Sequence, residues 1–155
     1  MGLVMLANKL LRSFFVNLKD KPNFKKICVI GLGYVGLPTA AIIANQGITV
    51  SGIDVDKQTV ETINKGEIHI IEPDLDVMVR NAVNIGKLYA STSIEPADAF
   101  IIAVPTPFKD KNEPDLKYLE QAIQSVASVL KQGNLVILES TSPVGTTKQI
   151  SRWLS

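Results

Sequence analysis

The residues with the clearest chemical meaning are three glycines spaced as GxGxxG. Residues 31–36 (GLGYVG) directly follow the apolar run 27–30 and directly precede a segment with helical character. In this setting Gly31 permits a tight turn, Gly33 lets a phosphate approach the backbone, and Gly36 lets helix and strand pack closely. The first N–H groups and the positive end of the helix dipole then face a pyrophosphate. The spacing predicts a dinucleotide-binding turn, and a purely structural glycine turn is the alternative.

An acidic residue stands where such a turn needs one. Asp54 lies 18 residues after Gly36 and ends the apolar run 49–53. A carboxylate there accepts hydrogen bonds from the adenosine ribose and repels the additional phosphate of NADP, so the sequence predicts NAD as the cofactor. The alternative, that Asp54 only caps the next helix, is weaker because Asp56 is better placed for capping. Lys57 is a nearby cation that would tolerate the NADP phosphate.

Hydroxyl side chains follow the later apolar runs. Thr106 stands between two prolines after the run 99–104, and Thr141, between two serines, follows the run 135–138. Thr147 comes at the start of the last helical segment, where an ordinary helix cap is the alternative interpretation. Because ligands bind beyond the carboxyl ends of parallel strands, we expect Thr106 and Thr141 beside the cofactor.

Three residues with the chemistry of nucleophiles or bases are assigned no catalytic role. Cys28 lies inside the first apolar run and is expected to be a buried, inert side chain. His69, the single histidine, is expected to be solvated or locally bonded. Glu139 adjoins a predicted buried strand and is expected to be paired or partly exposed. We predict no metal site.

Strands and helices are expected to alternate along the chain. Runs of apolar, often β-branched residues predict strands at 27–30, 49–53, 88–91, 99–104 and 135–138. Caps, periodicity and glycine stops predict helices at 38–46, 56–64, from 73 onward, at 116–130 with Asp115 as cap, and from 146 onward. Three prolines predict a loop at 105–115. The fold class is therefore α/β, a Rossmann-type doubly wound parallel sheet with helices on both faces.

The composition limits the class of protein. The chain has 155 residues, 46% of them hydrophobic and 20% charged, which suits one ordered domain with a buried core. Sixteen basic residues against 15 acidic ones argue against a nucleic-acid partner, and a single cysteine excludes a disulfide framework.

Residues 1–24 are expected to form an N-terminal extension ahead of a domain at 25–155. Lys9 and Arg12 interrupt the apolar residues of this segment, so it fits neither a signal peptide nor a membrane span. Its leucines have the spacing of a short amphipathic helix, and a loosely packed extension is the alternative. We expect a cytoplasmic protein.

Four separate motifs resemble one known family. GLGYVGLPTA, GEIHIIEPDL, AVPTPF and LESTSPVGTT, in this order, are similar to the N-terminal domain of the nucleotide-sugar 6-dehydrogenases over residues 25–155. The segments GEIHIIEPDL and AVPTPFKDKNEPD most resemble the members that act on UDP-N-acetyl-D-mannosamine. Residues 1–24 lie outside the family pattern.

The resemblance implies a four-electron oxidation of a UDP-sugar C6 alcohol to a carboxylate, with two NAD reduced, for surface polysaccharide synthesis. UDP-glucose and UDP-N-acetylglucosamine are the alternative substrates. The family's catalytic cysteine and lysine belong to a later substrate domain, joined by a linker helix, so the resemblance leaves this chain no catalytic residue beyond an assisting Thr141. It also implies a homo-oligomer for the full-length protein. A stand-alone nucleotide-binding module is the alternative of another class.

The resemblance further assigns cofactor contacts residue by residue. These contacts are Tyr34, Val35, Asp54 and Thr106, with Thr141 near the nicotinamide and Thr147 at the cofactor site.

Overall fold

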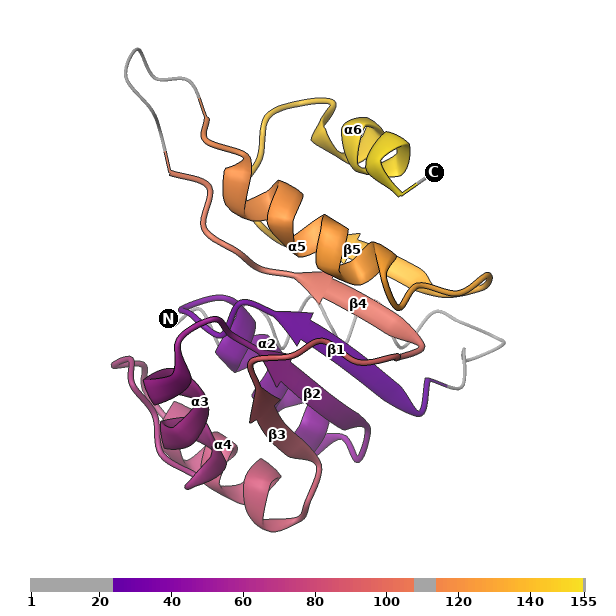
Figure 1. The fold of residues 1–155 in the computed structure, drawn as a ribbon. Coiled ribbons are helices and arrows are strands. Elements are labelled where there is room, and N and C mark those ends of the chain that lie inside the picture. Colours follow the sequence, from indigo (N-terminus) through magenta and orange to yellow (C-terminus); the bar gives the residue numbers. More distant parts are fainter. Residues whose placement is uncertain (1–23, 108–113, 155) are drawn as a thin grey trace.

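The structure, a computed structural model, describes residues 24–107 and 114–154. The predicted amphipathic helix of the extension and the middle of the predicted proline loop therefore lie outside the described residues. Figure 1 shows one sheet with helices on both sides. The elements are β1 (Lys26–Ile30), α2 (Gly36–Asn45), β2 (Thr49–Ile53), α3 (Lys57–Asn64), α4 (Leu75–Asn84), β3 (Leu88–Ser91), β4 (Ala99–Ile102), α5 (Lys117–Ala127), β5 (Leu135–Leu138) and α6 (Thr146–Trp153).

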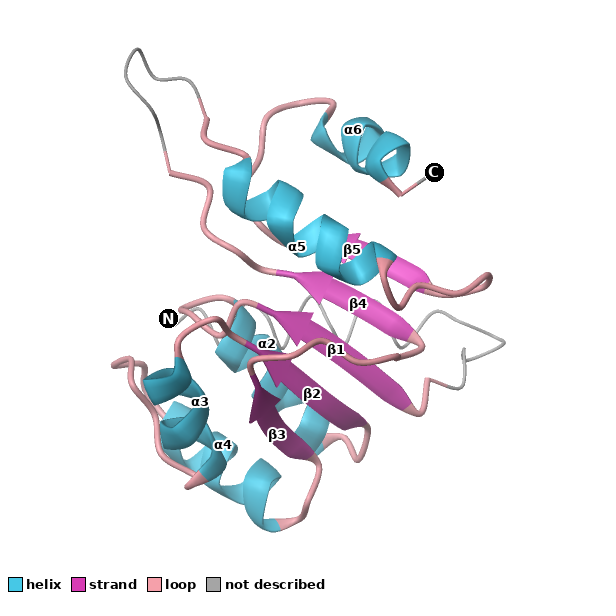
Figure 2. Ribbon diagram, viewed as in Figure 1, coloured by secondary structure: helices cyan, strands magenta, loops and turns pink. Residues whose placement is uncertain are grey.

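The sheet has the order β3-β2-β1-β4-β5, and every neighbouring pair is parallel. The arrowheads of β1, β2 and β4 accordingly point the same way in Figure 2. The strand β1 lies at the centre, and its last four residues are buried because they are apolar on both faces. The predicted Rossmann-type parallel sheet is confirmed.

Each face of the sheet has its own hydrophobic core. Ile27 and Val29 of β1 point into one core with residues of α2 and α4, and Cys28 and Ile30 point into the other with α5 and α6. In the view of Figure 1, α2 lies behind the sheet and α5 in front of it. Cys28 is fully buried, and burial raises the pKa of its thiol to about 11, so the expectation of an inert cysteine is confirmed.

Two boundaries of strands and helices differ clearly from those predicted. The strand β4 ends at Ile102, two residues early, because the N–H groups of Glu139 and Ser140 both donate to the Ile102 carbonyl and the ladder ends there. The helix α2 begins at Gly36 rather than residue 38, since the Leu37 N–H already donates to the Gly33 carbonyl.

Both predicted aspartate caps bind backbone N–H groups. Asp56 caps α3 by accepting from the N–H groups of Gln58 and Thr59, both at 3.1 Å. Asp115 accepts from the Lys117 N–H at 3.0 Å, although the cap position itself is Leu116. None of the helices in the described ranges is long and apolar enough to cross a membrane.

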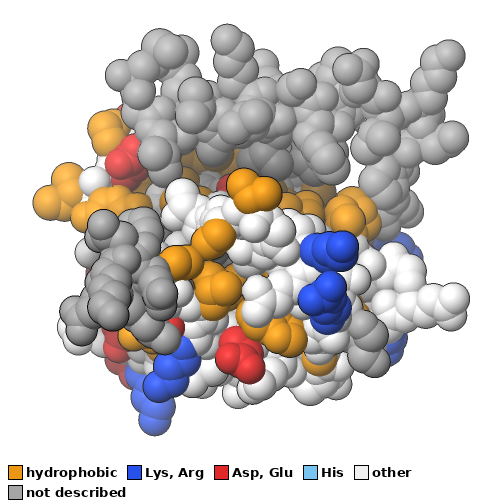
Figure 3. Space-filling view, turned by 90° about the horizontal axis from the view of Figure 1, so that it is seen from above, with side chains coloured by type: hydrophobic (Ala, Val, Ile, Leu, Met, Phe, Trp, Pro, Cys, Tyr) orange, Lys and Arg blue, Asp and Glu red, His pale blue; other side chains and the backbone are white. Residues whose placement is uncertain are grey.

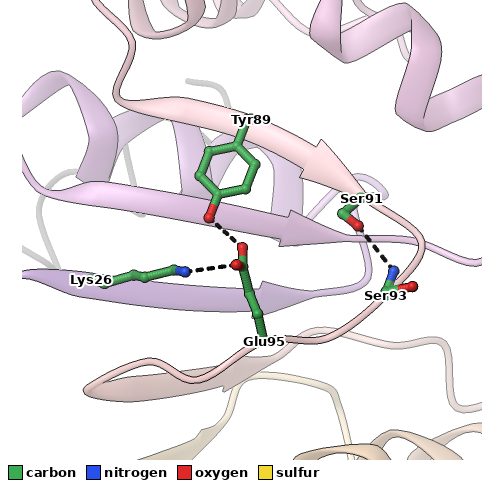
Figure 4. Close-up of polar contacts among 5 residues, drawn as sticks. All are labelled: Lys26, Tyr89, Ser91, Ser93 and Glu95. Carbon is green, nitrogen blue, oxygen red and sulfur yellow. Dashed lines mark hydrogen bonds and ion pairs between the residues drawn. The ribbon is translucent and has the colours of Figure 1, made fainter.

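The connection from β3 to β4 crosses β2 and β1 without a helix, and a polar cluster fixes it (Figure 4). The carboxylate of Glu95 lies 2.9 Å from the Lys26 ammonium and accepts a hydrogen bond from the Tyr89 hydroxyl. Asp98 then accepts from the N–H groups of Lys25 and Lys26 at the start of β1. The ion pair between Lys26 and Glu95 and the bonds to Asp98 thus hold a connection that has no crossover helix, and Ile94 and Ala97 pack it against the core.

The last strand, β5, is apolar but only half-buried. All four of its residues are hydrophobic, alternately facing the two cores, and all four are partly exposed. Figure 3 views the side of the molecule on which α6 lies and shows hydrophobic side chains gathered across the middle of that face. The entirely apolar composition of β5 is typical of an interior strand of a parallel sheet rather than an edge strand.

We predict that Glu95→Gln lowers the free energy of unfolding at neutral pH by about 0.5–1 kcal/mol, the range for a partly exposed ion pair. Burial opposes ionisation of Glu95, but hydrogen bonds from Tyr89 and Lys26 outweigh it and hold its pKa below the ordinary 4.5. A lowered pKa stabilises the fold above pH 4.5, and this stabilisation is lost as the pH falls through the lowered value.

Urea unfolding at neutral pH and at about pH 3 measures this effect. The difference between wild type and Glu95→Gln should be present at neutral pH and shrink in acid. Glu67→Gln, at an exposed position, is the matched control. A difference of equal size at both pH values would contradict the role of the ionised carboxylate.

Candidate dinucleotide-binding site

The loops that follow β1, β2, β4 and β5 meet at the carboxyl edge of the sheet. From β1 the chain leads to α2 on one face, and from neighbouring β4 it leads to α5 on the other face. Such a switch point leaves a crevice between the two connections, where ligands of α/β sheets bind. The predicted site residues are carried by the segments around this crevice.

Two of the three glycines are required by the protein's own packing. A Cβ at Gly31 would lie 2.6 Å from the Ala103 carbonyl oxygen, and the residue has a positive φ of 90°. A Cβ at Gly36 would lie 1.8 Å from the Gly31 carbonyl oxygen. Any side chain at either position would collide with backbone atoms, so these glycines serve the fold itself.

Gly33 differs, because a Cβ there would meet no atom within 4 Å. The protein's packing therefore gives no reason for glycine at this position, whereas a phosphate that lies against the backbone does. The helix α2 has no side-chain cap and no acidic residue in its first turn. Its N–H groups and positive dipole end therefore suit an anion beside Gly33. The neighbouring Tyr34 and Val35 are exposed at this turn.

Asp54 lies directly after β2 and binds two backbone N–H groups. Its Oδ2 accepts from the Leu32 N–H at 2.9 Å, and its Oδ1 accepts from the Asp56 N–H at 3.0 Å. Because each carboxylate oxygen accepts two hydrogen bonds, both keep capacity for a ribose hydroxyl. Capping of α3 belongs to Asp56, as expected. The bond to Leu32, which sequence reasoning missed, ties the glycine turn to the end of β2.

The hydroxyl residues after β4 and β5 come together. The Thr106 hydroxyl donates to the Thr141 carbonyl oxygen at 2.5 Å and lies 3.3 Å from the Thr141 hydroxyl. The Ser140 hydroxyl donates to the Val104 carbonyl oxygen at 2.7 Å. These bonds join the two loops into one wall of the crevice, and both threonines lie at the edge where sequence reasoning expected them.

Thr147 lies exposed in the first turn of α6. The cap position is Gly145, with a φ of 94°, and Thr146 donates its hydroxyl to the Pro143 carbonyl oxygen at 2.8 Å. The cap interpretation of Thr147 is therefore wrong, and its contact with a cofactor stays a prediction. His69 is exposed on the connection between α3 and α4, as expected. The described residues contain no cluster of three or more metal-ligating side chains.

Glu139 turns its side chain toward α2. Its Oε1 accepts from the Thr39 hydroxyl at 2.9 Å, while its Oε2 is buried without a hydrogen-bond partner among the described residues. Burial raises the pKa of this carboxyl, and the bond from Thr39 opposes that rise. The expectation of a paired or partly exposed glutamate is confirmed, but its partner was not foreseen.

The sequence of this chain matches a known protein family. The profile described as UDP-glucose/GDP-mannose dehydrogenase family, NAD binding domain, matches residues 25–155. The chain belongs to this family. The cofactor is NAD, as predicted, and the open backbone at Gly33, the uncapped start of α2 and the acid at Asp54 fit it.

The family relatives include enzymes named for aminosugar nucleotides. The chain is 62% identical over 134 residues to the UDP-N-acetyl-D-mannosamine dehydrogenase of Campylobacter jejuni, covering 86% of this chain and 33% of that protein. It is 59% identical to the NDP-N-acetyl-D-galactosaminuronic acid dehydrogenase of Ralstonia nicotianae, covering 86% and 31% of the two chains.

Solved structures in the family have the same fold. The UDP-D-ManNAc dehydrogenase from Pyrococcus horikoshii superimposes with a TM-score of 0.80 at 44% identity, covering 83% of this chain and 31% of that one. The chain thus spans about a third of the length of the relatives it matches.

Gly33→Ala and Gly36→Ala form a matched pair that separates the cofactor from the fold. We predict that Gly33→Ala keeps its free energy of unfolding within about 0.5 kcal/mol of wild type and weakens NAD at least tenfold, about 1.4 kcal/mol. Gly36→Ala should unfold the chain or destabilise it by several kcal/mol, because its Cβ overlaps a carbonyl oxygen.

Thermal unfolding and calorimetric titration with NAD measure the two effects. Full NAD affinity in a folded Gly33→Ala chain would contradict the placement of the pyrophosphate against this glycine.

Proposed function

We propose that this chain is the NAD-binding part of a nucleotide-sugar 6-dehydrogenase that oxidises the C6 alcohol of UDP-N-acetyl-D-mannosamine to a carboxylate. The observation that carries the proposal is that the open backbone at Gly33 and the acid at Asp54 belong to adjoining segments, joined by the bond from the Leu32 N–H to Asp54. The identity of 62% to an enzyme named for this substrate supports the choice of sugar. The product would supply an acidic aminosugar to a surface polysaccharide.

In this proposal each segment at the carboxyl edge has one task. The start of α2, with Gly31, Gly33 and Gly36, holds the pyrophosphate, and Asp54 binds the adenosine ribose. Tyr34 and Val35 flank the pyrophosphate, and Thr106, Thr141 and Thr147 line the far side, with Thr141 closest to the nicotinamide. NAD supplies the hydride acceptor when bound.

The covalent chemistry is proposed to come from outside this part of the protein. Cys28 is fully buried, and burial raises the pKa of its thiol to about 11, which disfavours the thiolate that a nucleophile needs. The sugar would be held by a substrate domain that corresponds to the two-thirds of the relatives beyond the matched region. We propose residues 25–155 as the NAD domain, residues 1–24 as an extension, and a cytoplasmic homo-oligomer as the working form.

A chimera tests the proposed activity directly. Residues 25–155 would replace the matching region of the Campylobacter jejuni enzyme, to which they are 62% identical. We predict NAD-dependent oxidation of UDP-N-acetyl-D-mannosamine by the chimera, measured by NADH absorbance and mass spectrometry of the product. The 155-residue chain alone should bind NAD and leave the sugar unoxidised.

Other outcomes of this experiment decide against parts of the proposal. Sugar oxidation by the 155-residue chain alone would refute the need for a second domain. A chimera that oxidises UDP-glucose or UDP-N-acetylglucosamine instead would change the substrate. A folded chimera that binds NAD and oxidises no sugar would favour a stand-alone nucleotide-binding module.

Asp54→Ala tests the cofactor preference. We predict that it weakens NAD by about 1–2 kcal/mol, because the hydrogen bonds to the ribose and the anchor of the glycine turn are lost together. NADP should be weakened less, since the repelling charge is also removed. Titration of both nucleotides measures the ratio of affinities, with Glu61→Gln on the exposed face of α3 as control. An unchanged ratio would show that Asp54 does not contact the ribose.

A further inference from the structure

Thr39 is the one polar side chain among the buried residues of α2. It lies one turn into α2 and is only 2% exposed. Its hydroxyl donates to Glu139 Oε1 at 2.9 Å, across 100 residues of sequence. The bond therefore joins α2 to the segment that follows β5.

Glu139 stands at the point where that segment leaves the sheet. Its N–H donates to the Ile102 carbonyl oxygen at 2.9 Å, and the next two residues are Ser140 and Thr141, which bond to the loop after β4. We call the Thr39–Glu139 hydrogen bond the link. One end of the link is thus α2, whose start is proposed to hold the pyrophosphate. The other end is the loop assigned to the nicotinamide side of the crevice.

The two ends of the link belong to opposite layers of the fold. The helix α2 packs against one core, whereas the segment after β5 leads to α6 in the other core. A side-chain bond between them joins the two layers beyond Ile102, the residue at which the β4–β5 ladder ends.

A gain in the stability of the fold does not explain this hydrogen bond. Glu139 Oε2 is buried and has no hydrogen-bond partner among the described residues, and a buried carboxyl without full pairing destabilises a fold. Even for buried ion pairs, replacement by apolar side chains of similar volume is often neutral or stabilising. The link therefore calls for a role beyond packing.

We propose that Glu139 is a positioning residue that acts through Thr39 and sets the spacing between the pyrophosphate and nicotinamide halves of the NAD site. This proposal rests on the placement of NAD given under Proposed function. NAD spans both halves of the crevice, whereas ADP reaches only the adenosine and pyrophosphate half. Loss of the link therefore affects the two ligands differently.

The test compares NAD and ADP binding by calorimetric titration of the 155-residue chain. The double variant Thr39→Val/Glu139→Met removes the link and leaves no unpaired carboxyl behind. We expect it to weaken NAD about three- to tenfold, the effect of losing about one hydrogen bond. ADP affinity should stay within about twofold of wild type.

Conservative and single variants complete the design. Thr39→Ser keeps the hydroxyl and should bind both ligands as wild type does. Thr39→Val alone gives the same comparison if thermal unfolding shows that the double variant is not folded. Glu61→Gln on α3 is the matched control for loss of a carboxylate elsewhere.

Four results would overturn the proposal. Equal weakening of NAD and ADP would mean that the variant only loosens the start of α2. Unchanged binding of both ligands would mean that the spacing does not depend on the link. If the wild-type chain binds NAD no more tightly than ADP, the nicotinamide half adds no affinity, and the proposal loses its basis while the pyrophosphate site stays intact. If the wild-type chain binds neither ligand, the cofactor site is overturned as well.

Discussion

Backbone packs directly against backbone where the turn after β1 passes the end of β4. At Gly31 a Cβ would lie 2.6 Å from the Ala103 carbonyl oxygen, and at Gly36 a Cβ would touch Gly31 itself. Because no side chain separates these segments, α2 begins directly against the sheet and its first N–H groups face the crevice. The proposed phosphate site and the central packing of the fold therefore depend on the same glycines.

The fold was predictable because its signals are local. Each strand of a buried parallel sheet is a short apolar run, and the five runs were placed correctly, including the weak one at Leu88–Ser91. Asp56 was also predicted as a cap, since its partners lie within three residues of it. Boundaries were less accurate. The end of β4 depends on Glu139 and Ser140, which compete for one carbonyl group from a distant part of the chain.

The site was predictable as a set of residue types and places but not as a set of pairs. The spacing of a dinucleotide motif points to Gly33 and Asp54, and their contact with NAD stays a prediction. The partners within the site are separated by 22 residues for Leu32 and Asp54, 35 for Thr106 and Thr141, and 100 for Thr39 and Glu139. No periodicity connects residues so far apart, and only the order of the strands brings them together.

The strand order also has a consequence for biosynthesis. Among the described strands β1 is translated first and occupies the centre of the sheet. Lys26 of β1 and Asp98, which directly precedes β4, bond across 72 residues of sequence. At 5–20 residues per second, about 4 to 14 s pass before β4 has been translated. Throughout that interval one apolar edge of β1 is unpaired. Until β4 is made, the nascent protein therefore exposes an edge of the strand that later lies at the centre of its sheet.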